Sequence, residues 1–193
     1  KRQILLYRKW FLRLNTFISD EAMSPQIKFS IIIPARNEEE NIVECLQSVL
    51  NQKYSSDLFE VIVVDDYSTD STTFLVESIQ TIHPNLKLLR LADILSGEKL
   101  NSYKKKAIEV GIQNASGDWI VTTDADCIVT KDWLLNYANK IQSSNAVFIA
   151  APVKIVSTGN MLSVFQQLDF MVLQGITMAS VGAGFHSMCN GAN

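Results

Sequence analysis

Short apolar runs alternate with segments of helical pattern along this chain, and this alternation constrains the fold more than any other feature of the sequence. The runs predict strands over residues 29–33, 60–65, 86–91, 118–124 and 146–153, and the segments after them predict helices over 38–51, 70–82, 102–114, 131–142 and 160–178. Strands that alternate with helices build a mostly parallel sheet with helices on both faces. We therefore expect a Rossmann-like α/β domain.

The composition fits one compact domain and excludes several classes of protein. The chain has 193 residues, of which 47% are hydrophobic and 19% charged, whereas a disordered chain carries fewer apolar residues. Its formal net charge of −3 argues against nucleic acid as a partner. Cys45, Cys127 and Cys189 are odd in number and form no C-x-x-C pair, which favours reduced thiols in a cytoplasmic compartment and gives no zinc signature. We expect Cys127 to pack rather than react.

Asp124 and Asp126 stand at the end of the fourth predicted strand, with one residue between them. In an extended chain residues i and i+2 point to the same side, and the carboxyl ends of parallel strands open into the crevice where such sheets bind ligands. Two carboxylates there suit Mg²⁺ or Mn²⁺, which leave coordination positions for phosphate oxygens. The pair therefore predicts a metal–diphosphate site, with a solvated turn or a helix cap as the alternative.

Pro34 ends the first predicted strand, and Ala35, Arg36 and Asn37 form the turn into the next helix. This turn places backbone N–H groups and the Arg36 side chain at the sheet edge, where a nucleotide would sit. The alternative is a plain helix start, with Asn37 as its cap and the three following glutamates beside the positive end of the helix dipole. Both interpretations can hold together, and Glu38 is the one of these glutamates that we consider a site candidate.

Asp65 and Asp66 end the second predicted strand, and Asp70 follows in the turn. We expect Asp70 to cap the next helix together with Ser68 or Thr69. Two acids at a strand end also occur in phospho-acceptor receiver domains, which need a later single Asp and then a Lys. Here the later acids form a pair and the lysines precede them.

The strings PARNEE, VVDDYSTDS, KKKAIEVGI and TDAD follow one another in an order and at separations that resemble the family 2 glycosyltransferases. The resemblance covers about Phe29 to Asn193. It implies the GT-A nucleotide-diphospho-sugar transferase fold, truncated at its C-terminal end. We accordingly expect a basic helix and linker in residues 1–26 and a nucleotide-sugar-binding domain in residues 27–193.

The resemblance also implies roles for particular residues. Asp66 matches the acid that accepts the imide N3–H of uracil, and Lys104 matches the lysine beside the diphosphate, although Tyr103 replaces the motif glycine before it. Asp126 matches the metal-coordinating acid, and Asp124 matches the acid that contacts the ribose or the water shell of the metal. The implied nucleotide-binding set is Pro34, Ala35, Arg36, Asn37, Glu38, Asp65, Asp66, Lys104, Asp124 and Ala125, with Asp126 and Asp124 holding Mn²⁺ or Mg²⁺.

The reaction implied by the resemblance is transfer of a sugar, with inversion, from a nucleotide-diphospho-sugar to an acceptor hydroxyl of a carbohydrate or lipid. We expect a UDP-sugar as the donor. In this family a carboxylate that follows a Gly-Ala-Asn loop removes the acceptor proton, and here such a loop reaches Asn193. We therefore expect the chain to carry the donor half-site, to lack the base and to have little or no activity alone. Two alternatives stay open. One is a sugar-phosphate nucleotidyltransferase, but such enzymes usually have a Gly-rich loop after the first strand, and PARNEE does not resemble it. The other is a non-catalytic nucleotide-binding or scaffold domain.

The segment after Pro152 is expected to form the sugar and acceptor side. Residues 165–170, FQQLDF, have a helical packing pattern, and residues 182–193 resemble the family segment that closes over the donor sugar. His186 in that loop is a lone histidine, which is little reason to assign it as a base.

The first 18 residues carry an apolar stripe at helical spacing, formed by Tyr7, Trp10, Phe11, Leu14, Phe17 and Ile18. Basic residues accompany the stripe, and no acidic residue precedes Asp20. Such a helix can lie on an anionic membrane surface, flank a membrane span on its cytoplasmic side, or pack on protein. The first two interpretations place the parent protein at the cytoplasmic face of a membrane. Residues 19–26 then resemble a linker.

Overall fold

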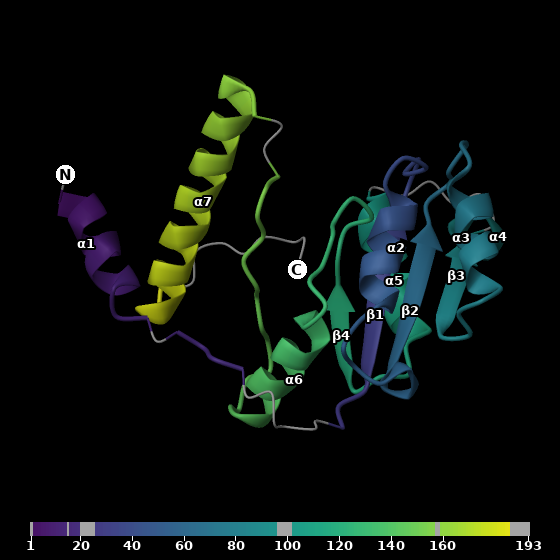
Figure 1. Cartoon of the computed structure of the whole chain (residues 1–193), viewed down its shortest axis with the longest axis horizontal. Helices are drawn as coiled ribbons and strands as arrows, with labels where there is room; N and C mark the ends of the chain where they lie inside the picture. Colours follow the sequence, from purple (N-terminus) through teal and green to yellow (C-terminus); the bar gives the residue numbers. More distant parts are fainter. Residues whose placement is uncertain (1, 15, 20–25, 96–101, 157–158, 186–193) are drawn as a thin grey trace. The chain divides into compact units, whose positions relative to one another are not determined.

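The computed structural model describes residues 2–14, 16–19, 26–95, 102–156 and 159–185, and the chain divides into two compact units (Figure 1). Residues 19–147 form a unit that contains the sheet, and residues 1–18 with 148–191 form a helical unit. The division into residues 1–26 and 27–193 that the sequence suggests stays a prediction.

The sheet unit contains four parallel strands in the order β3-β2-β1-β4. They are β1 (Phe29–Ala35), β2 (Phe59–Asp65), β3 (Leu86–Arg90) and β4 (Trp119–Thr122). These bounds confirm four of the five predicted strands to within two residues at each end. β1 and β2 are buried along almost their whole length, which explains why they read as continuous apolar runs rather than as an alternating pattern.

Helices cover the sheet and connect its strands. In chain order they are α2 (Ile42–Leu50), the short 3₁₀ helix η1 (Ser56–Leu58), α3 (Thr72–Gln80), α4 (Leu91–Ile94), α5 (Tyr103–Gln113) and α6 (Trp133–Gln142). The two short helices, η1 and α4, were not predicted. α5 packs on the face that presents Ile32, Ile62 and Val64. The packing is close, because a Cβ on Gly111 would lie 2.5 Å from Ile32 Cγ2.

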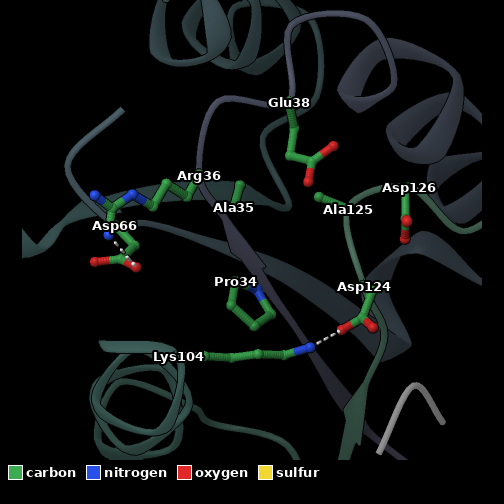
Figure 2. Close-up of a pocket in the computed structure, with 9 residues that line it drawn as sticks. All are labelled: Pro34, Ala35, Arg36, Glu38, Asp66, Lys104, Asp124, Ala125 and Asp126. Atoms are coloured by element: carbon green, nitrogen blue, oxygen red, sulfur yellow. Dashed lines mark hydrogen bonds and ion pairs between the residues drawn. The ribbon is translucent and has the colours of Figure 1, made fainter. Parts of the chain in front are cut away.

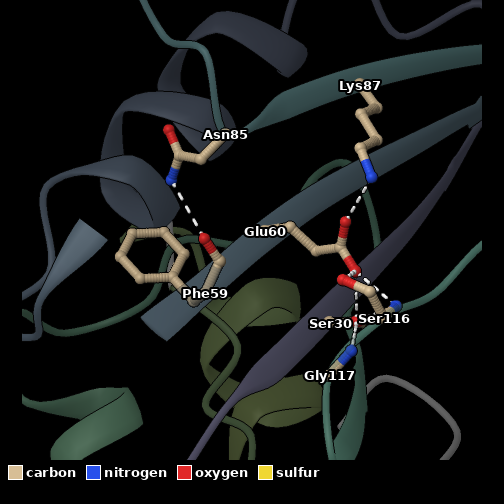
Figure 3. A network of polar contacts seen from close by, with 7 residues as sticks. All are labelled: Ser30, Phe59, Glu60, Asn85, Lys87, Ser116 and Gly117. Carbon is tan, nitrogen blue, oxygen red and sulfur yellow. Dashed lines mark hydrogen bonds and ion pairs between the residues drawn. The ribbon is translucent and has the colours of Figure 1, made fainter. Parts of the chain in front are cut away.

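Glu60 ties β1, β2 and the α5–β4 connection together at the end of the sheet where the strands begin (Figure 3). Its Oε1 accepts hydrogen bonds from Ser30 Oγ and the Ser116 N–H, both at 2.6 Å, and its Oε2 accepts one from Lys87 Nζ at 2.6 Å. Burial alone would raise the pKa of Glu60, but the hydrogen bonds from Lys87, Ser30 and Ser116 outweigh it and lower the pKa to about 2. Gly117 completes the cluster, because a Cβ there would lie 2.6 Å from the backbone nitrogen of Ser30.

The fifth predicted strand, 146–153, is wrong. Residues 145–156 form no strand, and the side chains of Val147 and Phe148 are 92% and 72% exposed. The polar backbone groups of Val153 bond to a side chain rather than to another strand: its N–H donates to Gln174 Oε1 at 2.7 Å, and its carbonyl accepts from the same amide group. An apolar run becomes a strand only where a neighbouring strand accepts its hydrogen bonds, and the described residues provide none here.

The helical unit contains α1 (Arg2–Phe11) and α7 (Met161–Gly182), which pack against each other. α7 confirms the predicted helix over 160–178 and is longer by one turn. α1 ends at Phe11 and a turn follows, so the stripe extending to Ile18 does not lie on one helix, and that part of the prediction is wrong. None of the helices in the described ranges combines the length and hydropathy that a membrane span requires. Most of the predicted linker, at 20–25, and the loop with His186 and Cys189 lie outside the described residues.

Candidate functional site

A cavity of about 350 Å³ opens where the strands of the sheet end (Figure 2). It is lined by Pro34, Ala35, Arg36, Glu38, Asp66, Lys104, Asp124, Ala125 and Asp126. Nine of the eleven residues suggested by the sequence thus meet in one place, and Asn37 and Asp65 are the two that do not line it. Because β1 pairs with β2 on one side and with β4 on the other, the cavity lies at the topological switch point where open α/β sheets bind ligands.

Asn37 turns the β1–α2 loop toward the neighbouring β2–α3 loop. Its backbone has a left-handed φ of 54°, which Asn tolerates better than most residues. Its N–H donates to Ser68 Oγ at 3.0 Å, and its side-chain Oδ1 accepts the N–H of Thr69 at 2.8 Å. α2 begins only at Ile42, so the interpretation of Asn37 as its cap is wrong.

The next two backbone amides bond to the same neighbouring loop. The Glu38 N–H donates to Thr72 Oγ1 at 2.8 Å, and the Glu39 N–H donates to Asp70 Oδ2 at 3.1 Å. Glu39 returns the contact by accepting the N–H of Ser71 at 2.9 Å, so it is more than the dipole and solvent residue that the sequence suggested. Asp70 accepts the N–H of Thr72 at 3.0 Å and so supports the start of α3 as expected, although Ser71 holds the N-cap position. The N–H groups of residues 37–39, expected to face a nucleotide, therefore face the β2–α3 loop instead.

Asp66 is buried and borders the cavity from the end of β2. Its Oδ2 lies 3.7 Å from the guanidinium of Arg36, whereas its Oδ1 is buried and has no hydrogen-bond partner among the described residues. Burial raises the pKa of Asp66, the Arg36 charge opposes that rise, and the neighbouring Asp65 adds to it. Asp65 itself points elsewhere and accepts the N–H of Ser68 at 3.3 Å, so it braces the loop behind the cavity.

Two tyrosines that the sequence analysis did not assign to the site support Arg36. Its guanidinium lies 5.9 Å from the centroid of the Tyr103 ring, in the range of a cation–π contact. Tyr103 in turn meets Tyr67 edge to face, with ring centroids 5.8 Å apart. The signal that could have found this group is the presence of Tyr103 where the family motif has glycine.

Asp124 and Asp126 lie in a turn rather than on the strand. β4 ends at Thr122, and the Cys127 N–H donates to the Asp124 carbonyl at 3.1 Å, so the argument from an extended chain is wrong in its geometry. Both carboxylates nevertheless line the cavity. Lys104 Nζ lies 2.7 Å from Asp124 Oδ1 and joins the start of α5 to this turn (Figure 2).

The two thiols near this turn, Cys45 and Cys127, both have raised pKa values. Burial and the nearby Cys127 and acidic groups raise the pKa of Cys45 to about 12, and its Sγ lies 3.6 Å from the Asp124 carbonyl oxygen. Burial and the adjacent Asp126 also raise the pKa of Cys127. Both groups therefore stay protonated near neutral pH.

The donor groups of the cavity fit a divalent cation that shares its coordination with phosphate. The described residues contain no group of three or more His, Cys, Asp or Glu side chains placed to hold a metal by themselves. The ionisable lining residues are two cations, Arg36 and Lys104, and four acids, Glu38, Asp66, Asp124 and Asp126, so their formal net charge is −2. Mn²⁺ or Mg²⁺ would cancel this charge and prefers the oxygen ligands found here.

The sheet order separates this fold from receiver domains. In the receiver order 2-1-3-4-5 the first strand lies between the second and the third, whereas here β1 lies between β2 and β4. The receiver alternative is therefore excluded.

Comparisons with solved structures point to glycosyltransferases. TarS 1–349 from Staphylococcus aureus in complex with UDP-GlcNAc has a TM-score of 0.57 and 30% sequence identity, over 69% of this chain and 36% of that chain. The mannosyltransferase PcManGT from Pyrobaculum calidifontis in complex with GDP-Man and Mn²⁺ has a TM-score of 0.60 and 28% identity, over 79% and 43% of the two chains. The parallel sheet and these neighbours show the GT-A fold.

The curated relatives agree. Glycosyltransferase AglE from Haloferax volcanii is 32% identical over 125 residues, and poly(ribitol-phosphate) β-N-acetylglucosaminyltransferase TarS from Staphylococcus aureus is 32% identical over 131 residues. These matches cover 65% and 68% of this chain but only 39% and 22% of the relatives, so the chain spans well under half of their length. The family model described as glycosyl transferase family 2 matches residues 30–165, more than half of the chain, and the chain therefore belongs to that family.

Proposed function

We propose that this chain binds a UDP-sugar and provides the donor side of a metal-dependent, inverting glycosyltransferase. The observation that carries the proposal is the convergence of Asp66, Lys104, Asp124 and Asp126 on one cavity at the carboxyl edge of the sheet. The UDP-GlcNAc complex of TarS and the complex of PcManGT with GDP-Man and Mn²⁺ support a nucleotide-sugar as the donor.

We propose that Asp66 recognises the uracil ring of the nucleotide. Its buried Oδ1 has no hydrogen-bond partner in the described part of the chain, and a buried acceptor without a partner is costly. The imide N3–H of uracil would satisfy it. We further propose that Asn37 and Asp65, which do not line the cavity, act from behind it by holding the loops that carry Arg36 and Asp66.

The proposed metal ligands are Asp126 and Asp124. When bound, Mn²⁺ or Mg²⁺ would supply positive charge against the departing diphosphate. Lys104 Nζ lies 2.7 Å from Asp124 Oδ1, and we expect its ammonium group, which has three N–H donors, to donate to a phosphate oxygen as well as to that carboxylate.

The proposed reaction is a single displacement. The acceptor hydroxyl, on a carbohydrate or a lipid, forms the new bond to the anomeric carbon from the face opposite the diphosphate. The carbon–oxygen bond to the diphosphate breaks and its electron pair leaves with the nucleoside diphosphate, while a carboxylate base takes the acceptor proton. The base is not assigned to any described residue, and we expect the chain alone to have little or no transferase activity.

We also propose that the parent protein works at the cytoplasmic face of a membrane. The support is the absence of acidic residues before Asp20 together with the basic residues there, since positively charged flanks favour the cytoplasmic side.

Calorimetric titration of the chain with UDP and with GDP tests the proposed site. In the presence of Mn²⁺ we expect tighter binding of UDP, and Asp66→Asn should weaken it by roughly 10- to 100-fold, since a hydrogen bond to a charged group contributes about 1.5–3 kcal/mol. Asp126→Ala should remove the dependence of UDP affinity on Mn²⁺, and Asp124→Ala should affect the metal less and the nucleoside more.

Asp93→Asn is a matched control, because Asp93 is an exposed acid on α4, outside the cavity. It should leave UDP binding unchanged. Equal affinity for UDP and GDP would refute the uracil assignment, and UDP affinity that survives EDTA unchanged would refute the metal site.

A further inference from the structure

The helical unit exposes many large apolar side chains. Along α7 six large apolar side chains are more than half exposed: Met161, Leu162, Phe165, Leu168, Met171 and Val172. Only one residue of this 22-residue helix, Asp169, is charged. Apolar patches of this kind mark surfaces that are covered by a partner or by lipid.

The side of α1 that faces away from α7 combines apolar and basic groups. On the other side of α1, Tyr7 and Trp10 are half-buried, and Trp10 stacks on Phe185, next to the end of α7, with ring centroids 5.3 Å apart. Leu5 and Leu12 are 64% and 67% exposed, and their spacing of seven residues puts them on one side of the helix. The Leu12 N–H donates to the Arg8 carbonyl at 3.0 Å, so the helical path continues to Leu12.

Arg8 and Lys9 flank the line from Leu5 to Leu12, because helical residues three and four positions apart are neighbours. Both basic side chains are exposed. Leucines bordered by basic residues form the kind of helix face that inserts into the headgroup boundary of a bilayer.

The charges of the chain are separated between its two units. Residues 1–18 and 148–191 contain six basic residues and one acid, a net charge of +5, whereas residues 19–147 contain 11 basic and 19 acidic residues, a net charge of −8. The apolar surface therefore lies on the positively charged unit, although the whole chain is negative. An anionic surface complements this unit and repels the other one.

We propose that the α1–α7 unit is a docking surface for anionic lipid, with Leu5 and Leu12 entering the interface and Arg8 and Lys9 pairing with the headgroups. This inference rests on the proposed membrane location of the parent protein and names the partner as anionic lipid. The proposal predicts that α1 lies in the plane of the membrane interface and does not cross the bilayer.

Co-sedimentation of the whole chain with vesicles tests the proposal. We expect binding to vesicles of phosphatidylglycerol and phosphatidylcholine in equal parts, little binding to phosphatidylcholine alone, and loss of binding at about 1 M salt, where charges are screened within about 3 Å. Arg8→Gln/Lys9→Gln should weaken binding about 25-fold, at about fivefold for each basic residue removed. Leu5→Gln/Leu12→Gln should also weaken it, while Gln keeps the helix propensity close to that of Leu.

The matched control is Lys105→Gln/Lys131→Gln, which removes two exposed charges from the sheet unit and should leave vesicle binding unchanged. Three results would overturn the proposal: no binding of the wild-type chain to anionic vesicles, equal loss in the control, or a dimer that the two leucine substitutions abolish while vesicles are not bound. UDP titration of the same variants separates the two proposals, because the donor site can bind UDP whether or not the helical unit binds lipid.

Discussion

Removal of the Glu60 charge should destabilise the sheet unit measurably. The hydrogen bonds to Glu60 lower its pKa from 4.5 to about 2, and the side chain is only 11% exposed. A difference of this size corresponds to roughly 3 kcal/mol of folding free energy, at 1.36 kcal/mol for each pKa unit. We therefore expect Glu60→Gln to lower the free energy of unfolding by roughly 3 kcal/mol at pH 7, since the amide keeps the shape but cannot pair with Lys87.

The pH dependence follows from the direction of the shift. Because the pKa of Glu60 is lower in the folded protein than in the unfolded chain, its contribution is fully present above about pH 5 and disappears as the pH falls toward 2. The difference in unfolding free energy between wild type and Glu60→Gln should therefore fall by about half between pH 7 and pH 3. Other carboxylates titrate in both proteins and cancel in this difference.

Urea unfolding at a series of pH values measures this difference. Tryptophan fluorescence is suitable, because Trp119 and Trp133 both lie in the sheet unit. Glu44→Gln is the control, since Glu44 is exposed on α2, and it should change stability by less than about 0.5 kcal/mol. A difference between wild type and Glu60→Gln that stays constant from pH 7 to pH 3 would refute the assignment of a low pKa to the buried cluster.

Two further predictions concern packing and reactivity. Gly117→Ala should destabilise the protein by about 2 kcal/mol or more, because its Cβ would meet backbone atoms at 2.6 Å; urea unfolding measures this, and Gly175→Ala, whose Cβ would meet nothing closer than 3.9 Å, is the control that should cause no loss. Cys45 should resist iodoacetamide in the folded protein, because it is buried and its pKa is raised to about 12; peptide mass spectrometry should find it labelled only after unfolding, and equally fast labelling before unfolding would contradict the burial argument.

The sequence predicts the part of the fold that local pattern determines. β1 and β2 are long apolar runs, and Pro34 and the two acids lie within one residue of the strand ends, so these signals locate the strands closely. The run at 146–153 is apolar as well and forms no strand, because pairing depends on a neighbour distant in the sequence. Apolar character alone does not distinguish the two cases.

In the candidate site too, local pattern predicts some features, while others depend on contacts between residues distant in the sequence. Carboxylates at strand ends indicate the cavity, because the carboxyl ends of parallel strands meet at one edge. The role of Asn37 could not be read in this way, since its bonds reach Ser68 and Thr69, more than 30 positions away in the chain. The three glutamates after Asn37 favour a helix locally, but the bonds to the β2–α3 loop hold their backbone out of α2 until Ile42.

The bonds between the two loops occupy backbone amides that could have formed a fixed cradle for oxyanions. The amide hydrogens of residues 37–39, which could hold phosphate oxygens at such a position, already serve another loop. The two cationic side chains, Arg36 and Lys104, each face a carboxylate. Each of them would therefore give up part of that contact in order to bind an arriving anion. An anion that comes alone therefore gains little here, and under the proposed function a diphosphate and its counter-ion enter best together, as one nearly neutral species.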